Sequence, residues 1–182
     1  MTRIRLASAD DAGAIARVQM AAWRAAYADI VPAQFLASLD VGERVDRWRT
    51  RISPAADSGA PTFVALDTTD AVRGFAHSGP IRDDDLSPEG RAEVYTVYVD
   101  PVAWRRGIGS TLMTAVDDFW GLSGIRELVL WTFEDNPAAR TFYEQLGYTF
   151  DGTRKIDDFG GTRIAEVRYR RRMPIRFSPA AS

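Results

Sequence analysis

The stretch Val97–Met113, VYVDPVAWRRGIGSTLM, combines an expected strand, a basic loop with two glycines and an expected helix. Its apolar first residues end at Asp100-Pro101, and apolar residues at helical spacing begin at Ile108. The free N–H groups in the first turn of a helix, together with the helix dipole, favour an anion in front of that turn. The order of strand, loop and helix therefore predicts a binding site for a phosphate group.

The residues of this loop narrow the kind of phosphate site. Gly107 and Gly109 have no Cβ, so a phosphate can approach the backbone closely. Arg105 and Arg106 add positive charge and forked donors that match phosphate oxygens. A dinucleotide fingerprint needs a third glycine where Leu112 stands, and a nucleoside triphosphate loop needs a lysine that this stretch lacks. The alternative to a phosphate site is a basic turn that only caps a helix.

A second motif, NPAARTFYEQLGY, lies at Asn136–Tyr148. Asn136 is a favourable N-cap, and Pro137 suits the first position of a helix. The apolar residues that follow share one helix face, and Gly147 suits the position just after the helix end. This motif predicts a short helix that follows the phosphate loop in the chain.

Together the two motifs resemble those of the GNAT superfamily of N-acetyltransferases. In that superfamily a [Q/R]-x-x-G-x-[G/A] run opens a helix after a strand, and an N-x-x-A-x-x-F-Y-x-x-x-G-F/Y run often follows. The second run is matched at every position, whereas Trp104 stands where the first usually has Gln or Arg. The resemblance implies an α/β fold whose mixed, mostly antiparallel sheet is flanked by helices on both faces. It also implies that strands four and five splay apart to admit acetyl-coenzyme A.

The resemblance also implies which residues hold acetyl-coenzyme A as co-substrate. The backbone amides of residues 105–110 would bind its pyrophosphate, and the backbone of residues 97–99 would line its pantetheine arm. Asn136 would bond an amide of that arm or only cap its helix. The predicted cofactor-binding residues are Val97, Tyr98, Val99, Arg105, Arg106, Gly107, Ile108, Gly109, Ser110, Asn136 and Tyr143.

Acetyl transfer to an amine needs an unprotonated nitrogen, a stabilised oxyanion and a protonated leaving thiolate. The resemblance makes Glu93 the predicted base, because several members place a glutamate there; the alternative is an exposed carboxylate at a strand end. His77 is the competing base by its ordinary pKa. The resemblance makes Tyr143 the predicted acid, a role compatible with packing in the core. The amide of Val97 or a neighbour would polarise the thioester carbonyl.

The acceptor site is less clearly marked. The superfamily uses its first two helices and the loop after its third strand. In this chain that loop carries the acidic run Asp83-Asp84-Asp85, which can attract a cationic amine or simply be a solvated loop. The two helices carry aromatic residues that can line a pocket or belong to the core. They are Trp23, Tyr27, Phe35 and Trp48.

Composition sets the remaining expectations. The 182 residues are enough for a single domain over 1–182, with residues 174–182 expected as a flexible tail. A net charge of −2 argues against nucleic-acid or membrane partners. There is no cysteine and His77 is the one histidine, so no metal site is expected. The chain shows no signal peptide and no long apolar run, which predicts a cytoplasmic protein; a homodimer stays open.

Hydrophobic periodicity predicts the other elements. The expected strands are 2–6, 62–66, 72–78, 93–99, 128–133, 148–156 and 162–169. The expected helical regions are 8–27, 32–51, 108–119 and 137–146. The expected loops are 53–61 and the charged segment 81–91.

Two classes of function remain. The first is an N-acetyltransferase that moves an acetyl group from acetyl-coenzyme A to a primary amine of a small molecule or peptide, by direct attack in a ternary complex. The second is a non-catalytic sensor of acyl-coenzyme A, or an interaction module, with the same fold. Glu93 and Tyr143 together favour the enzyme, because a sensor needs neither. A dinucleotide oxidoreductase is disfavoured by the missing third glycine.

Overall fold

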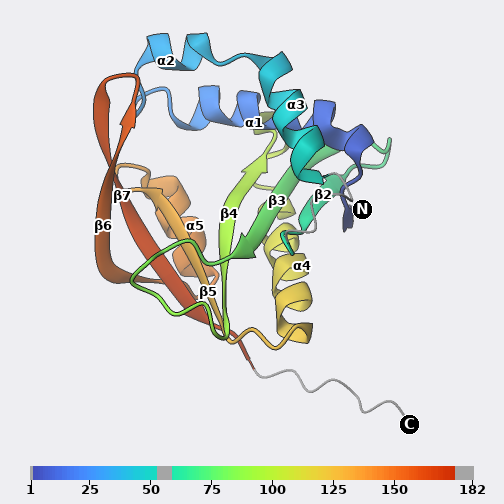
Figure 1. Ribbon diagram of the computed structural model, residues 1–182. Coiled ribbons are helices and arrows are strands. Elements are labelled where there is room, and N and C mark those ends of the chain that lie inside the picture. Colours follow the sequence, from blue (N-terminus) through green and yellow to red (C-terminus); the bar gives the residue numbers. More distant parts are fainter. Residues whose placement is uncertain (1, 53–58, 175–182) are drawn as a thin grey trace.

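The computed structural model describes residues 2–52 and 59–174, and the strands in these ranges form one seven-stranded sheet (Figure 1). The strand order is β1-β2-β3-β4-β5-β7-β6, and all neighbours run antiparallel except the parallel pair β4 and β5. The predicted mixed, mostly antiparallel sheet is therefore confirmed. The strands are β1 (Arg3–Leu6), β2 (Thr62–Leu66), β3 (Val72–Pro80), β4 (Arg91–Val99), β5 (Glu127–Phe133), β6 (Thr149–Phe159) and β7 (Thr162–Arg172). Residues 53–58 of the predicted loop and 175–182 of the predicted tail lie outside the described residues.

Helices cover both faces of this sheet. Figure 1 shows α1, α2 and α3 together on one side, whereas α4 packs on β1, β2, β3 and β4 from the other. The helices are α1 (Ala12–Ala26), α2 (Ala33–Ser38), α3 (Val41–Ile52), α4 (Ile108–Leu122) and α5 (Pro137–Gln145), with short 3₁₀ turns at Ala9–Asp11 and Pro101–Ala103.

The region 32–51, predicted as one helical region, consists of two helices. Leu39 has an extended ψ of 114°, which ends α2. Asp40 then accepts a hydrogen bond from the backbone N–H of Glu43 at 2.8 Å, so its carboxylate caps the start of α3. The break follows from a local side chain to backbone bond that competes with a continuous helix.

Two hydrophobic clusters lie on opposite faces of the sheet, and β2 contributes to both. Phe63 and Ala65 pack in the cluster that contains Leu112 of α4. Val64 and Leu66 pack in the cluster formed with α1 and α3. This division follows from the alternation of side chains along a strand.

The sheet opens between β4 and β5. These strands pair only through Arg91–Val94 and Glu127–Leu130. Beyond that point β4 continues to Val99 against β3, and β5 continues to Phe133 against β7. The splay implied by the resemblance is therefore present, and it leaves the second half of β4 without a partner on the β5 side.

Candidate active site

The opening between β4 and β5 leads into a cavity of about 790 Å³. Its walls come from the end of α1, the second half of β4, the loop before α4 with the first turn of that helix, the end of β5, α5 and the β6–β7 hairpin. The cavity brings together all the predicted cofactor-binding residues except Arg106, which is exposed and lies outside its wall. The lining residues among the predicted ones are Val97, Tyr98, Val99, Arg105, Gly107, Ile108, Gly109, Ser110, Asn136 and Tyr143.

The loop at one end of the cavity has the backbone of an anion site. Arg105 has φ +59° and Gly107 has φ +78°, so two nearby residues are left-handed. Such a backbone turns successive N–H groups toward a common centre. Gly107 is also the N-cap of α4, and its carbonyl accepts from the amide of Thr111 at 3.0 Å. A left-handed residue favours glycine, which explains Gly107 by conformation as well as by access.

Gly109 and Trp104 have packing roles that the sequence did not reveal. A Cβ on Gly109 would lie 3.1 Å from Cζ of Phe142, so glycine lets α4 start close to α5. Trp104 donates from Nε1 to the carbonyl of Val99 at 2.7 Å. The indole thus fixes the loop to the end of β4, at the position where the superfamily usually has Gln or Arg.

Asn136 and Tyr143 place polar groups of α5 in the cavity wall. The Oδ1 atom of Asn136 accepts from the amide of Ala139 at 3.0 Å, which confirms the predicted N-cap. That bond does not use Nδ2, the side-chain nitrogen of Asn136. Burial raises the pKa of the Tyr143 phenol, and the nearby Tyr98 adds to the effect. The Tyr143 phenol therefore stays protonated at neutral pH and can donate a proton.

Aromatic rings form the wall on the side of α1. Trp23 and Tyr27 line the cavity, and Tyr27 donates to the hydroxyl of Tyr98 at 3.3 Å. The other two predicted aromatic residues do not line it. Phe35 packs on Phe159 with ring centroids 5.8 Å apart, and Trp48 is buried in the core with only 1% of its surface exposed.

The structure places neither candidate base in the cavity wall. Glu93 is 2% exposed, and its carboxylate accepts from the backbone N–H and the guanidinium of Arg82. His77 is also buried, with Nδ1 3.0 Å from Oγ1 of Thr62. Burial lowers the pKa of His77 to about 4, so this imidazole is neutral at pH 7. Glu93 is therefore not an exposed strand-end carboxylate, and its role as a base stays a prediction.

Glu166 of β7 lines the cavity, and sequence analysis missed it. Its side chain is 16% exposed, and Oε2 lies 2.9 Å from Nζ of Lys155. Burial raises the pKa of the Glu166 carboxyl, and the Lys155 ammonium acts against that rise. The sequence predicted the hairpin that carries Glu166, but it contained no signal that this hairpin borders the opening beside β5.

Comparisons with known proteins agree with this geometry. A model of the acetyltransferase (GNAT) family matches residues 23–148, which include both motifs. The chain is 32% identical over 170 residues to YuaI of Bacillus subtilis (strain 168), an uncharacterised N-acetyltransferase, covering 92% of this chain and 91% of that protein. The chain belongs to the GNAT family of acetyltransferases. The predicted superfamily is thus confirmed.

Solved GNAT structures share the fold. The PaiA N-acetyltransferase of Thermoplasma acidophilum, in complex with coenzyme A, superposes with a TM-score of 0.71 at 22% identity, over 91% of this chain and 98% of that one. YncA of Salmonella typhimurium with acetyl-coenzyme A superposes with a TM-score of 0.71 at 21% identity, over 100% of this chain and 99% of that one.

The chain also shares sequence with a mycothiol acetyltransferase of Renibacterium salmoninarum. The two are 33% identical over 86 residues, which make up 47% of this chain and 25% of that protein.

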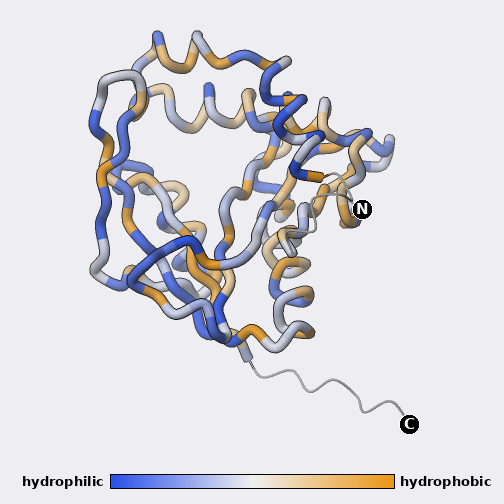
Figure 2. Tube along the Cα trace, in the orientation of Figure 1, coloured by the Kyte–Doolittle hydropathy of each residue, from blue (hydrophilic) through white to orange (hydrophobic). Residues whose placement is uncertain are grey.

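The acidic run of this GNAT chain takes part in ion pairs with a buried arginine. The segment between β3 and β4 is hydrophilic over most of its length (Figure 2). Asp83 and Asp85 nevertheless bind Arg168, with N–O distances of 3.1 and 2.7 Å, and the Arg168 side chain is only 4% exposed. Asp83 also accepts from Nε1 of Trp131 at 3.1 Å. Both carboxylates neutralise a buried arginine. The solvated-loop alternative fails for Asp83, whose side chain is 16% exposed, but holds for Asp85, whose side chain is 60% exposed; the amine site stays a prediction.

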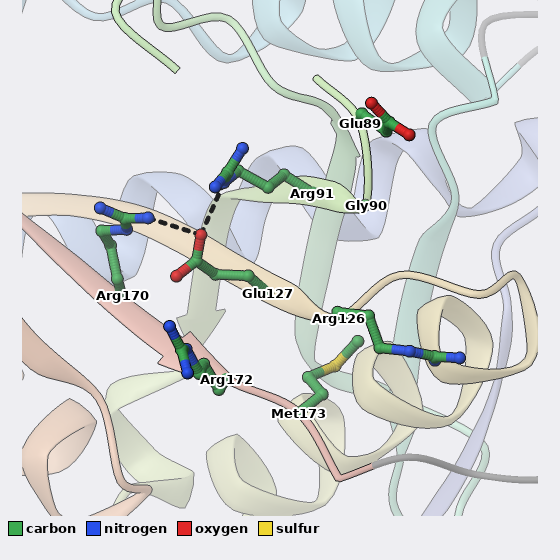
Figure 3. A pocket seen from close by; sticks show the side chains of 8 residues that line it. All are labelled: Glu89, Gly90, Arg91, Arg126, Glu127, Arg170, Arg172 and Met173. Carbon is green, nitrogen blue, oxygen red and sulfur yellow. Dashed lines mark hydrogen bonds and ion pairs between the residues drawn. The ribbon is translucent and has the colours of Figure 1, made fainter. Parts of the chain in front are cut away.

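A second, smaller cavity of about 460 Å³ lies at the start of β4, far from the phosphate loop that follows the end of this strand (Figure 3). Glu127 bridges two of its arginines, with 2.6 Å to Nε of Arg91 and 2.6 Å to Nη2 of Arg170. The remaining lining residues are Glu89, Gly90, Arg126, Arg172 and Met173. Ion pairing and solvated arginines account for this basic cavity.

No helix in the described ranges combines the length and the apolar character needed to cross a membrane. Among the same residues, no group of three or more His, Asp or Glu side chains is arranged to hold a metal ion.

Proposed function

We propose that this GNAT protein is an acetyl-coenzyme A-dependent N-acetyltransferase that acetylates a primary amine of a small molecule or peptide by direct attack in a ternary complex. One observation carries the proposal. A single cavity joins the left-handed loop at Arg105 and Gly107 to the Tyr143 phenol and the aromatic wall of α1. The groups proposed for phosphate binding and proton donation thus line the same cavity as the walls proposed for the acceptor.

The residues around the cavity fit coenzyme A. The loop N–H groups and Arg105 would hold the pyrophosphate, and Gly107 leaves its left-handed turn open, since a Cβ there would meet nothing within 4 Å. The second half of β4 has no β5 partner, so its backbone groups are available to pantetheine amides. When bound, acetyl-coenzyme A supplies a thioester. In the overall transfer the amine nitrogen bonds to the acetyl carbon, the carbon–sulfur bond breaks, nitrogen loses a proton and sulfur gains one.

Tyr143 and Glu93 are the proposed proton carriers. Tyr143 lines the cavity with a protonated phenol, which would supply the proton that sulfur gains. Burial raises the pKa of this phenol and makes it a weaker acid, so the proton would move only as negative charge builds up on sulfur. Glu93 would take the proton from nitrogen. Because its carboxylate is already bonded to Arg82, this role requires a water-mediated path or a movement of Arg82.

The alternative is a non-catalytic acyl-coenzyme A sensor or interaction module with the same fold. Both alternatives predict calorimetric binding of acetyl-coenzyme A. Only the enzyme releases free thiol when acetyl-coenzyme A is mixed with a panel of primary amines, in proportion to the amide formed. Binding without thiol release on any amine would favour the sensor, and no binding of acetyl-coenzyme A would overturn both.

The proposal also covers cellular setting and assembly. We infer a single cytoplasmic domain over residues 1–182 whose partners are acetyl-coenzyme A and the amine, without nucleic acid, membrane or metal. The net charge of −2 supports the exclusion of nucleic acid. A homodimer remains compatible with the proposal, and light scattering of the purified chain would decide it.

A further inference from the structure

The cavity wall carries two charges of opposite sign. Among the described residues that line it, Glu166 is the one carboxylate and Arg105 is the one arginine. Arg105 belongs to the phosphate loop, whereas Glu166 comes from β7, which β5 separates from β4 in the sheet. The anionic phosphates of a cofactor match the first charge. The negative charge of Glu166 has no role in the transfer chemistry proposed above, so it points to a positively charged group on another ligand.

Glu166 lies on the face of the sheet covered by α1 and α2. Ile164 lies two residues earlier in β7. It packs in one cluster with Val31, which belongs to the link between α1 and α2. Val167 packs in the cluster with α4 on the opposite face. Because side chains alternate along a strand, Glu166 shares the face of Ile164. The carboxylate therefore borders the cavity from the side opposite to α4, the helix that starts at the phosphate loop.

Aromatic rings surround this part of the wall. The rings of Tyr27 and Phe133 have centroids 4.7 Å apart, and those of Trp23 and Phe159 are 6.3 Å apart. All four residues line the cavity. Burial is the main cause of the raised pKa of Tyr27, and the charge of Glu166 adds to it, so the carboxylate is within electrostatic reach of this ring. Aromatic faces hold carbon skeletons and attract cations.

Glu166 shares its ammonium partner with a second carboxylate. Nζ of Lys155 lies 2.9 Å from Oε2 of Glu166 and 3.3 Å from Oδ2 of Asp157, so one ammonium faces two carboxylates. Lys155 and Asp157 are 40% and 48% exposed, whereas Glu166 is 16% exposed and is the member that faces the cavity. Burial and the nearby Asp157 raise the pKa of Glu166, and the Lys155 ammonium opposes that rise. A cation bound in the cavity would favour the charged carboxylate in the same way as Lys155, and a partly desolvated carboxylate gains more from it than a hydrated one.

We propose that Glu166 binds a positively charged acceptor amine as its ammonium ion, with the carbon skeleton against Trp23, Tyr27 and Phe159. The bound ammonium releases one proton to solvent before its nitrogen attacks, and the nitrogen loses its second proton in the transfer itself. The inference rests on the proposed acetyl transfer and narrows its acceptor class to cationic amines with an apolar or aromatic body. An acceptor with a carboxylate next to its amine would face Glu166 with a like charge, and is disfavoured.

Two probes of nearly the same shape test the role of charge without requiring turnover. The 2-phenylethyltrimethylammonium ion carries a fixed charge, cannot be acetylated and has the same outline as the neutral 2-methyl-4-phenylbutan-2-ol. Calorimetric titration of protein saturated with coenzyme A is expected to give at least tenfold tighter binding of the cation. Equal affinities, or no binding of either probe, would overturn the inference. Failure of coenzyme A itself to bind would instead count against the proposed function.

Two matched carboxylate variants assign the effect to Glu166. Glu166→Gln is expected to weaken binding of the cation at least tenfold and to leave the alcohol within twofold. Glu127→Gln is the control, because Glu127 is 14% exposed and paired with arginines in the remote cavity of Figure 3; both affinities should stay unchanged. If Glu166→Gln does not fold, Glu166→Asp replaces it in the test. This variant keeps the charge, and it should retain part of the preference for the cation. A preference for the cation that survives in Glu166→Gln would overturn the assignment.

Discussion

Replacing Gly107 with alanine isolates the contribution of backbone conformation to the phosphate loop. Gly107 has φ +78°, and an added Cβ would meet no heavy atom within 4 Å, so the change brings no clash. What remains is the penalty for a left-handed residue with a Cβ, about 1–2 kcal/mol. The free loop can relieve this strain by leaving the left-handed region, which turns its N–H groups away from a bound phosphate. The dissociation constant for acetyl-coenzyme A, measured by calorimetry, is therefore expected to rise about 5- to 30-fold.

Gly124 provides a control just beyond the other end of α4. It has φ +82°, its Cβ position is equally open, and it does not line the cavity. Gly124→Ala is expected to lose about 1–2 kcal/mol of unfolding free energy, which lowers Tm by about 2–8 °C for a chain of this size, and to bind acetyl-coenzyme A like the wild type. Gly107→Ala should lose no more stability than this. If Gly107→Ala binds acetyl-coenzyme A as tightly as Gly124→Ala, the left-handed turn does not shape the phosphate site and the reasoning is refuted.

Three further predictions concern single side chains. Tyr143→Phe is expected to fold and bind acetyl-coenzyme A but to slow transfer; single-turnover rates equal to wild type on two thioesters of different leaving-group acidity would remove the acid role. Glu93→Gln is expected to keep cofactor affinity and lower turnover by about two to four orders of magnitude, and an unchanged pH–rate profile would contradict the base assignment. The pKa of His77 is lowered to about 4, below its unfolded value of about 6.5, so only the unfolded state gains a proton between these pH values. The contribution of His77 to the free energy of unfolding is therefore expected to fall by about 3 kcal/mol from pH 6.5 to pH 4. Urea unfolding of wild type and His77→Gln across that range tests this, and parallel pH curves would count against it.

The parts of the fold that the sequence predicted well depend on local geometry. The cap at Asn136 and the start of α4 at Ile108 are set by residues a few positions apart. Most strands were placed within a few residues, because β2 and β3 flank a polar turn and alternation along the β6–β7 hairpin is visible in the chain. The predicted and observed elements thus agree wherever the contacts that form an element lie within one helical turn or one hairpin.

The unpredicted parts depend on contacts between distant segments. Arg82 covers Glu93, so a carboxylate predicted to be available is already bonded. Asp83 binds Arg168, which lies 85 residues later in the chain. The spacing of the acidic residues could not show that this carboxylate pairs with a buried arginine. Glu166 gave no signal, because a glutamate in an alternating strand looks the same whether it faces solvent or a cavity. Only the order of strands in the sheet separates these cases.

The cavity exists because β5 is held more completely by β7 than by β4. Glu127–Phe133 pairs with β7 along its whole length, but β4 pairs only with Glu127–Leu130. Past Leu130, β5 follows β7 while β4 follows β3, and the sheet opens (Figure 1). The same β7 strand brings Glu166 opposite Phe133, at the edge of that opening. The strand that keeps this opening is therefore also the strand that places a carboxylate beside it, so the proposed cofactor side and the proposed acceptor side of the cavity both depend on one hairpin.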